Sequence, residues 1–351
     1  MRFRSPVPCC SRAVALTLLL LLIPLVAPLL PPVRAQAFPT PKPPGKIVNL
    51  GGHRLHMNCT GKGRPTVVVE NGLGDFSFDW YLVQSQVSTF TRICTYDRAG
   101  YAWSDPGPKP RTFSQLNLEL HDALAKLGEH GPFVLVGHSY GGVVIRNFAL
   151  SYQRDVAGMV FVDSAFEGQR VGIGGKKTIR LGEDAKHRSI PPPHESMSLS
   201  DSPAKPPEAR PQEPLGAMYK VLPPPLQQMH LWAQSLAPIE DAENSQREWS
   251  SEYFARWLAQ PQQGTLGRIP VIVLAREKGG YNDGDYDIPG EQMERERKAG
   301  QAGLANLSSN SKLVLVPSGH NMELEAPDLV TAAIREVVEA ARSGAKIAAG
   351  H

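Results

Sequence analysis

The segment Gly137-His138-Ser139-Tyr140-Gly141 constrains the fold of this chain more than any other part of its sequence. A short apolar run at residues 133–136 precedes it, and an apolar stretch of helical character at residues 143–152 follows it. Glycine two positions either side of a serine is typical of a sharp strand-to-helix turn, where larger side chains would clash. Such a turn holds the serine in a strained backbone conformation and projects its hydroxyl above the sheet. We therefore expect Ser139 to be a nucleophile, and the amide of Tyr140 at the positive end of the helix to donate to an oxyanion.

Short apolar strands alternate with helices along most of the chain. The predicted strands are residues 66–70, 92–96, 133–136, 158–162, 269–275 and 312–316, after a hairpin at 46–59. The predicted helices are residues 112–127, 143–152, 291–307 and 327–342. Continuous runs of β-branched residues are typical of strands that are buried on both faces. The pattern predicts an α/β fold, with a largely parallel sheet covered by helices on both faces and a core formed by residues 46–165 and 268–345.

Residues 166–267 interrupt this alternation, which indicates a cap or lid inserted into the core. The first half, residues 172–211, is rich in Pro, Ser, Lys and Gly, so we expect it to lack regular structure. The second half, residues 215–257, is expected to form two or three helices with an aromatic and methionine-containing face. That face is formed by Met218, Tyr219, Met229, Trp232, Trp249, Phe254 and Trp257. Each of these side chains either packs the cap against the core or contacts a substrate.

The N-terminal residues have the pattern of an export signal. Arginines are followed by an apolar run at residues 13–30 and by small residues around Ala35. We expect residues 1–35 to be a signal peptide and residues 36–45 a proline-rich linker. The mature protein would then be exported (secreted, periplasmic or at the cell surface) without a stable membrane anchor. A retained membrane span is the alternative, because the apolar run borders the length needed to cross a bilayer.

The charge of the chain gives no sign of a polyanionic partner. The chain has 37 Lys and Arg against 34 Asp and Glu, a formal net charge of +3. Residues 1–35 contain four arginines and no acids, so the remainder has 33 basic and 34 acidic residues, a net charge of −1. We therefore expect no nucleic-acid partner and no electrostatic attraction to a membrane surface.

Two of the four cysteines, Cys59 and Cys94, would remain after removal of a signal peptide. Disulfides form and persist in oxidising compartments, which export implies. We expect Cys59 and Cys94 to pair, the alternative being two buried free thiols.

A serine hydroxyl is a weak nucleophile until a neighbouring base takes its proton. His320 is the candidate base, because it follows the predicted strand at 312–316 in a short loop that leads to the last helix. His138, which flanks the nucleophile, is expected to point away from it. His53 and His56 lie in the early hairpin without evident partners for a metal, so no metal site is expected.

The run Tyr96-Asp97-Arg98-Ala99-Gly100-Tyr101-Ala102-Trp103-Ser104-Asp105, with GHSYGG and SGHNMELEAPDLV, resembles the α/β-hydrolase superfamily. The resemblance spans roughly residues 47–342 and is to lipase- and esterase-like members with a cap after the sixth strand. It implies a mostly parallel eight-stranded sheet flanked by helices, a Ser-His-acid triad, no cofactor and an acyl-enzyme intermediate. It also implies that the strands carrying Cys59 and Cys94 are neighbours.

Two positions depart from the pattern of that superfamily. Its oxyanion loop usually begins His-Gly, whereas this chain has Asn71-Gly72-Leu73-Gly74. Because a backbone N–H does the work, Leu73 can still donate to an oxyanion, and Asn71 can replace the hydrogen bonds by which the histidine braces the loop.

The second departure is the triad acid, which superfamily members commonly carry just after the seventh strand. Here that strand is followed by no aspartate until Asp283. Asp163, at the end of the sixth strand, is the alternative position that some members use, and we take it as the candidate acid. Glu277, Asp283 and Asp285 stay open as alternatives.

These features predict an exported serine hydrolase that cleaves carboxylic esters of small molecules, with an apolar acyl or aromatic part favoured by the aromatic cap. A serine nucleophile argues against the epoxide-hydrolase and dehalogenase branches, which use aspartate there. A peptidase or amidase, an acyltransferase and a non-catalytic binding protein are the alternatives. Asp97 and Arg98 are expected to make structural ion pairs or hydrogen bonds to neighbouring loops.

Overall fold

The computed structural model describes residues 40–173, 175–194, 214–236, 238–277 and 279–347. The described residues belong to one compact unit. Residues 1–35, the predicted signal peptide, lie outside the described residues. Among the described residues, no helix combines the length and the apolar character needed to span a membrane.

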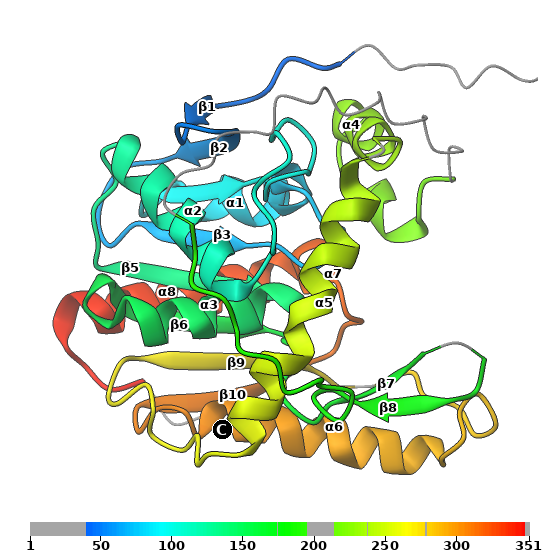
Figure 1. Ribbon diagram of the computed structural model, residues 1–351. Helices are drawn as coiled ribbons and strands as arrows, with labels where there is room; N and C mark the ends of the chain where they lie inside the picture. The colour runs from blue at the N-terminus through cyan, green and yellow to red at the C-terminus, as the bar shows by residue number, and fades with distance from the viewer. Residues whose placement is uncertain (1–39, 174, 195–213, 237, 278, 348–351) are drawn as a thin grey trace, which may run out of the picture. The chain divides into compact units, whose positions relative to one another are not determined.

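The core is an eight-stranded sheet in the order β1-β2-β4-β3-β5-β6-β9-β10. Its strands are β1 (Lys46–Asn49), β2 (Arg54–Thr60), β3 (Val67–Glu70), β4 (Ile93–Tyr96), β5 (Phe133–His138), β6 (Val156–Val162), β9 (Val271–Arg276) and β10 (Ser311–Val316). The pairings of β2 with β1 and β4 are antiparallel, and all the others are parallel. The sheet is therefore mostly parallel, as predicted, and the carboxyl ends of its parallel strands meet at one edge (Figure 1).

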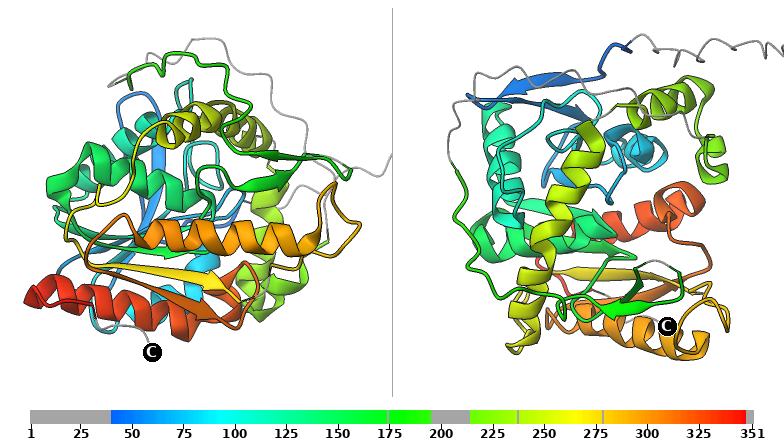
Figure 2. Two further views of the ribbon diagram at one scale, coloured as in Figure 1. Left: turned by 90° about the horizontal axis from the view of Figure 1, so that it is seen from below. Right: turned by 45° about the vertical axis from the view of Figure 1, so that its right-hand side comes forward.

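Helices cover both faces of this sheet. They are α1 (Tyr81–Val87), α2 (Phe113–Lys126), α3 (Tyr140–Ser151), α6 (Gly290–Ala305), α7 (Met322–Glu325) and α8 (Pro327–Ser343), with the 3₁₀ turns η1 (Ser77–Trp80) and η2 (Gln153–Asp155). Side chains of α2, α3 and α6 pack in one apolar cluster, and those of α1 and α8 pack in another. Figure 2 shows α6 and α8 on opposite sides of β9 and β10.

The β-branched runs explain this double covering. Along β3, Val67 and Val69 pack under α1 and α8, while Val68 between them packs on the side of α2 and α3. Successive side chains of a strand point to opposite faces, so a strand with helices on both sides needs apolar residues at every position. Each fully buried valine contributes roughly 1.5–3 kcal/mol through the hydrophobic effect.

The insertion at residues 166–267 contains β7 (Arg170–Gly172), β8 (Thr178–Arg180), η3 (Ala217–Val221), α4 (Pro224–Gln234) and α5 (Pro238–Leu258). The expectation that residues 172–211 lack regular structure is wrong for β8, which pairs with β7 in an antiparallel hairpin. Residues 195–211 lie outside the described residues. The helical second half is present as predicted, and Figure 1 shows α5 crossing in front of the sheet.

Aromatic residues of the insertion attach it to the core. Tyr253, Phe254 and Trp257 of α5 pack against Phe113 and Tyr140 at the start of α2 and α3. A second set, Trp232, Ile239 and Ala242, packs against Phe76, Phe78 and Tyr101. Of the face predicted from the sequence, Tyr219, Trp232, Phe254 and Trp257 are buried, and Met218 is exposed. Packing is thus the role that the structure gives to these buried aromatic residues.

Candidate active site

Ser139 lies at the junction of β5 and α3, with φ 49° and ψ −119°. A Cβ on Gly137 would lie 2.7 Å from the carbonyl carbon of Gly141, and one on Gly141 would overlap the carbonyl oxygen of Glu70. These two glycines are therefore required by the close passage of the turn over β3 and α3. The positive φ of Ser139 is the strained conformation expected of a serine at such a turn.

Asp163 immediately follows β6 and is 3% exposed, with Oδ2 2.6 Å from Nδ1 of His320. The turn at Ser139 is hydrogen-bonded to the segment that follows Asp163, because the amide of Ala165 donates to the carbonyl oxygen of Ser139 over 3.0 Å. A carboxylate at Nδ1 fixes the tautomer in which this nitrogen carries the proton, so Nε2 is left as the base. The side chain of His320 is 41% exposed, which leaves the base open to a substrate.

His320 lies next to the turn at Ser139, since its ring centroid is 4.7 Å from that of His138, the residue before Ser139. Among the hydrogen bonds of the described residues, none joins Ser139 Oγ to His320. Catalytic hydrogen bonds are often long in the absence of substrate and tighten only when it binds. The structure therefore brings Asp163 and His320 into direct contact and places Ser139 beside them; these three are called the triad residues below.

The alternative acids do not reach His320. Glu277, Asp283 and Asp285 are exposed. Asp283 accepts from the amide of Gly290, and Asp285 from the amide group of Asn282, both within their own loop. Of the four candidates, Asp163 alone has a described contact with the imidazole.

Arg276, which the sequence analysis did not single out, ends β9, next to where the superfamily commonly carries its acid. Its Nη1 donates to Asp163 Oδ2 over 2.6 Å and lies 3.1 Å from His320 Nδ1. Since Nδ1 is itself a donor to Asp163, Arg276 and His320 converge on one carboxylate oxygen. Burial raises the pKa of Asp163, but the hydrogen bond from His320 and the charge of Arg276 outweigh it and hold that pKa below its usual value. Burial, with the positive charges of His138 and Arg276, lowers the pKa of His320 despite Asp163.

The buried side chain of Arg98 holds the predicted oxyanion loop, residues 71–74, in place. Its guanidinium donates to Glu70 Oε1 over 2.8 Å and to the carbonyl oxygens of Asn71 and Gly72 over 2.6 and 2.5 Å. The side-chain amide of Asn71 donates to the carbonyl oxygen of Tyr96 over 2.6 Å. Arg98 thus makes the predicted hydrogen bonds to a neighbouring loop, and that loop is the one carrying Leu73.

The amides of Leu73 and Tyr140 are the predicted oxyanion donors. Within the described part of the chain, neither amide donates to a protein acceptor, so both are available to a ligand. Tyr140 is the first residue of α3, where the unpaired N–H groups and the helix dipole favour negative charge.

Asp97, the neighbour of Arg98, binds elsewhere. It pairs with His56 over 2.7 Å and accepts from the amide of Ser77 over 2.8 Å, both in buried positions. These contacts fix η1 and the early hairpin, which is the structural role expected from the sequence.

Cys59 and Cys94 form a disulfide, which is the pairing expected from the sequence. The two residues face each other directly in the antiparallel pairing of β2 with β4. Cys9 and Cys10 lie outside the described residues.

Two groups of described side chains lie close enough together to be considered as metal sites. The first contains Cys59 and Cys94, which as a disulfide have no thiolate to offer. The second is Asp75, His138 and Glu323, all buried. In that group both ring nitrogens of His138 already face oxygen atoms, Asp75 Oδ2 at 2.9 Å and the carbonyl oxygen of His320 at 3.0 Å. The nitrogens of His138 and the Asp75 oxygen that faces them are thus already engaged with each other and with the backbone.

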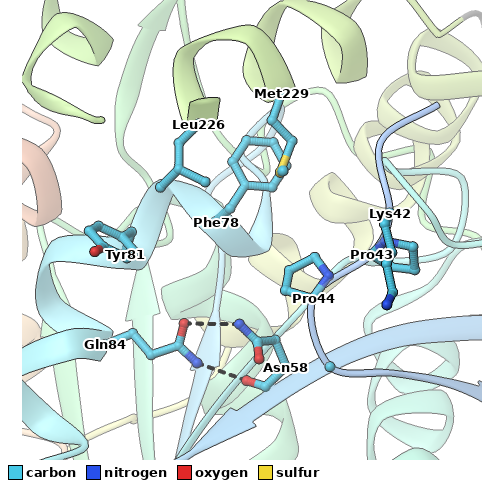
Figure 3. Close-up of a pocket in the computed structure, with 10 residues that line it drawn as sticks. Lys42, Pro43, Pro44, Asn58, Phe78, Tyr81, Gln84, Leu226 and Met229 are labelled. Carbon is cyan, nitrogen blue, oxygen red and sulfur yellow. Dashed lines mark hydrogen bonds between the residues drawn. The ribbon is translucent and has the colours of Figure 1, made fainter. Parts of the chain in front are cut away.

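Figure 3 shows a pocket of about 600 Å³ between α4, α1 and the segment that precedes β1. Phe78, Leu226 and Met229 form an apolar wall, and Asn58 and Gln84 hydrogen-bond each other on the opposite side. The triad residues are not among the lining residues, so this pocket contributes no group to the chemistry at Ser139.

Comparison with known proteins matches residues 67–333 to a family model described as "Alpha/beta hydrolase family". An "AB hydrolase superfamily protein" of Gibberella zeae is 24% identical over 308 residues, which are 80% of this chain and 88% of the relative. A "Probable transporter efuK" of Hormonema carpetanum is 37% identical over 129 residues, which are 34% of this chain and only 18% of that protein. The crystal structure of the enol-lactonase from Burkholderia xenovorans superposes with a TM-score of 0.57 at 17% identity, covering 84% of this chain and all of that one. At that identity the superposition shows a shared fold.

Proposed function

The chain belongs to the alpha/beta hydrolase family, and from this premise we propose that it is a serine hydrolase that cleaves carboxylic esters through an acyl-enzyme. The observation that carries the proposal is the 2.6 Å contact between Asp163 and Nδ1 of His320 beside the strained turn of Ser139. A carboxylate, an imidazole and a serine at a strand-to-helix turn are the acid, the base and the nucleophile of a catalytic triad.

The geometry supports the following reaction. Nε2 of His320 takes the proton of Ser139 as Oγ attacks the carbonyl carbon of the ester, and Asp163 stabilises the imidazolium that forms. The amides of Leu73 and Tyr140 donate to the oxyanion. The imidazolium gives its proton to the leaving alcohol as the C–O bond breaks. Water, deprotonated by His320, then attacks the carbonyl carbon of the acyl-enzyme. As the bond to Ser139 Oγ breaks, the imidazolium of His320 returns the proton to Oγ, which releases the acid and restores Ser139.

Arg276 and Arg98 serve this reaction without touching the reacting atoms. Arg276 keeps Asp163 ionised, since it donates to the oxygen that also accepts from His320. Arg98 holds the loop of Leu73 through two carbonyl oxygens. Both are positioning residues.

The apolar surroundings of the nucleophile favour an ester with an apolar acyl or aromatic part. Leu73 of the oxyanion loop packs at the edge of the cluster of Phe113, Tyr140, Tyr253 and Trp257. Small-molecule sites are mostly apolar with a few well-placed polar groups, which is the composition of this region. A peptidase or amidase and an acyltransferase would use the same residues, and a binding protein would use none of them.

A chain-length panel of p-nitrophenyl acyl esters, run beside aminoacyl p-nitroanilides, tests this proposal. We expect ester hydrolysis, with kcat/KM rising from acetate to longer acyl or aromatic esters, and none in Ser139→Ala. Faster cleavage of the anilides would point to a peptidase. Transfer to an added alcohol that outpaces hydrolysis would point to an acyltransferase.

Export is part of the proposal, supported by the sequence pattern of residues 1–35 and by the disulfide, which persists in oxidising compartments. Expression in a secreting host and intact-mass measurement should give a mature N-terminus close to residue 36. A secreted protein that still begins at Met1 would contradict cleavage.

A further inference from the structure

His138, the residue before the nucleophile, lies between two loops of the candidate site. Its side chain is 1% exposed. Nδ1 is 2.9 Å from Oδ2 of Asp75, two residues after Leu73 of the oxyanion loop. Nε2 is 3.0 Å from the carbonyl oxygen of His320. One imidazole ring therefore joins the nucleophile strand β5 to the oxyanion loop and to the loop of the base.

Glycines on both sides of His138 take part in this arrangement. A Cβ on Gly72 would lie 2.8 Å from Nδ1 of His138 and would overlap the carboxylate of Asp75, so a larger residue there would force this carboxylate away from His138. On the other side, the amide of Gly319 donates to Oε2 of Glu325 over 2.6 Å. The loop of His320 is thus held at two neighbouring residues, Gly319 through its amide and His320 through its carbonyl oxygen.

The partners of His138 determine its protonation state. A carbonyl oxygen can only accept a hydrogen bond, and so can an ionised carboxylate. A neutral imidazole has one N–H and would leave its other nitrogen lone pair facing an oxygen, whereas an imidazolium donates to both. Asp75 is ionised here, because the hydrogen bond and charge of His138 outweigh burial and hold its pKa below the usual value.

The buried cation faces Asp75 as its counter-charge, and Glu323 adds a second where it is ionised, since burial raises the pKa of Glu323 to about 7. Oε2 of Glu323 lies 3.9 Å from Nε2 of His138, is buried, and has no hydrogen-bond partner. Burial alone would lower the pKa of His138, but Glu323 and Asp75 outweigh it and raise that pKa to about 9.

We propose that His138 is a positioning residue, protonated at neutral pH, which clamps the oxyanion loop to the loop of His320 and by its charge keeps His320 in the neutral form that acts as the base. The proposal rests on the esterase chemistry proposed above. It adds a second imidazole to the site, that of His138, which is protonated where His320 is neutral and whose ring centroid is 4.7 Å from that of His320.

The charges around His320 come from several elements. Asp163 after β6 is the acid, Arg276 of β9 contacts it directly, and Arg297 of α6 lies 3.8 Å from its carboxylate. The other group is Asp75, His138 and Glu323, with the hydroxyls of Tyr219 and Tyr281 as uncharged neighbours at neutral pH. Of these, His138 and Arg276 oppose a positive charge on His320.

His138→Gln tests the charge, since glutamine is neutral and can still donate to the carbonyl oxygen of His320. A nearby like charge shifts a pKa by about one unit or more. We therefore expect the acid limb of kcat/KM against pH to move up by about one unit, with a loss in kcat larger than any change in KM. His121→Gln is the matched control, because His121 of α2 pairs with Asp155, outside the site, and its loss should leave the profile in place. A folded His138→Gln protein with an unmoved acid limb would overturn the proposal.

NMR of the histidine ring nitrogens gives a readout that needs no activity. In Ser139→Ala protein labelled with ¹⁵N, we expect one histidine to keep both ring N–H groups from pH 6 to 8, and its signal to be absent from the His138→Gln spectrum. A His138 ring that titrates near 6.5, or is neutral at pH 7.5, would refute the clamp even if esters are hydrolysed. Conversely, a protonated His138 in a protein that cleaves no ester would refute the proposed function and leave the charge assignment intact.

Discussion

Replacing Asp163 by asparagine removes the negative charge that faces Nδ1 of His320 at 2.6 Å while keeping the size of the side chain. If the asparagine presents its NH₂ group to Nδ1, that nitrogen must accept, so the proton moves to Nε2 and the base is lost. Loss of the correct tautomer costs about 10⁴-fold in kcat in enzymes of this kind. At 1.36 kcal/mol for each factor of ten, the barrier rises by about 5 kcal/mol.

The variant should still fold. Arg276 loses one charged partner but keeps contacts with the hydroxyl of Tyr281 and the carbonyl oxygen of Gly279. Hydrogen bonds to charged groups are worth about 1.5–3 kcal/mol, so we expect a fall of that size in the free energy of unfolding. The assay is kcat and KM on the best ester of the panel, with urea unfolding of the same samples.

Asp283→Asn is the matched control, because Asp283 is exposed and was an alternative acid in the sequence. Its kcat should stay within a factor of two of the unmodified enzyme. A folded Asp163→Asn enzyme with kcat reduced less than tenfold would refute the assignment of Asp163 as the triad acid.

Three further results are expected. In a pH profile of kcat/KM, the acid limb should have its midpoint below 6.5, the ordinary pKa of histidine. Burial and neighbouring positive charges lower the pKa of His320, and activity needs its neutral form. A midpoint above 6.5 would contradict this. Arg98→Met should reduce kcat by about 10²–10³-fold through loss of the oxyanion donor that Arg98 positions. It should also lower the free energy of unfolding in urea by about 3–5 kcal/mol, because buried Glu70 loses its charge partner and keeps only the hydroxyl of Tyr96; unchanged kcat would remove Arg98 from the support of the loop. Replacing Cys59 and Cys94 together by serine should cost about 3–4 kcal/mol in urea unfolding, the chain-entropy value for a separation of 35 residues, and two reactive thiols in unreduced, denatured protein would show that the bond is absent.

The parts of the site predictable from the sequence are those with a local signature. The two glycines around Ser139 are required by backbone within four residues and by the neighbouring strand, so the motif alone indicates the turn. The predicted helix at residues 112–127 also begins at a local contact, because the side-chain oxygen of Thr112 accepts from the amide of Gln115 three residues on. His320 could be found because a loop after the last strand leads to the edge of the sheet where β5 ends.

The supporting residues are joined across long stretches of sequence and have no such signature. His138 lies 63 residues from Asp75 and 182 from His320, and Arg276 lies 113 from Asp163. Their pairing depends on the order of strands in the sheet, which brings the ends of β5, β6 and β9 together. Arg276 had one signal in the sequence, its place near the usual position of the superfamily acid.

The insertion shows a different limit. A composition rich in Pro, Ser, Lys and Gly predicted no regular structure at residues 172–211, yet β8 pairs with β7 in a hairpin. Ion pairs from Arg170 and Arg180 to Glu296 connect this hairpin to α6. The composition of a segment indicates only its local conformational freedom. It does not indicate contacts with a helix that is distant in the sequence.

Covalent labelling with a fluorophosphonate tests the central claim, that Ser139 is an activated nucleophile. Intact-mass and peptide mapping should find one adduct per chain on the peptide containing Ser139, formed more slowly in Asp163→Asn and absent in Ser139→Ala. A folded, disulfide-bonded protein that takes up no label, or one labelled equally after Ser139→Ala, would contradict it.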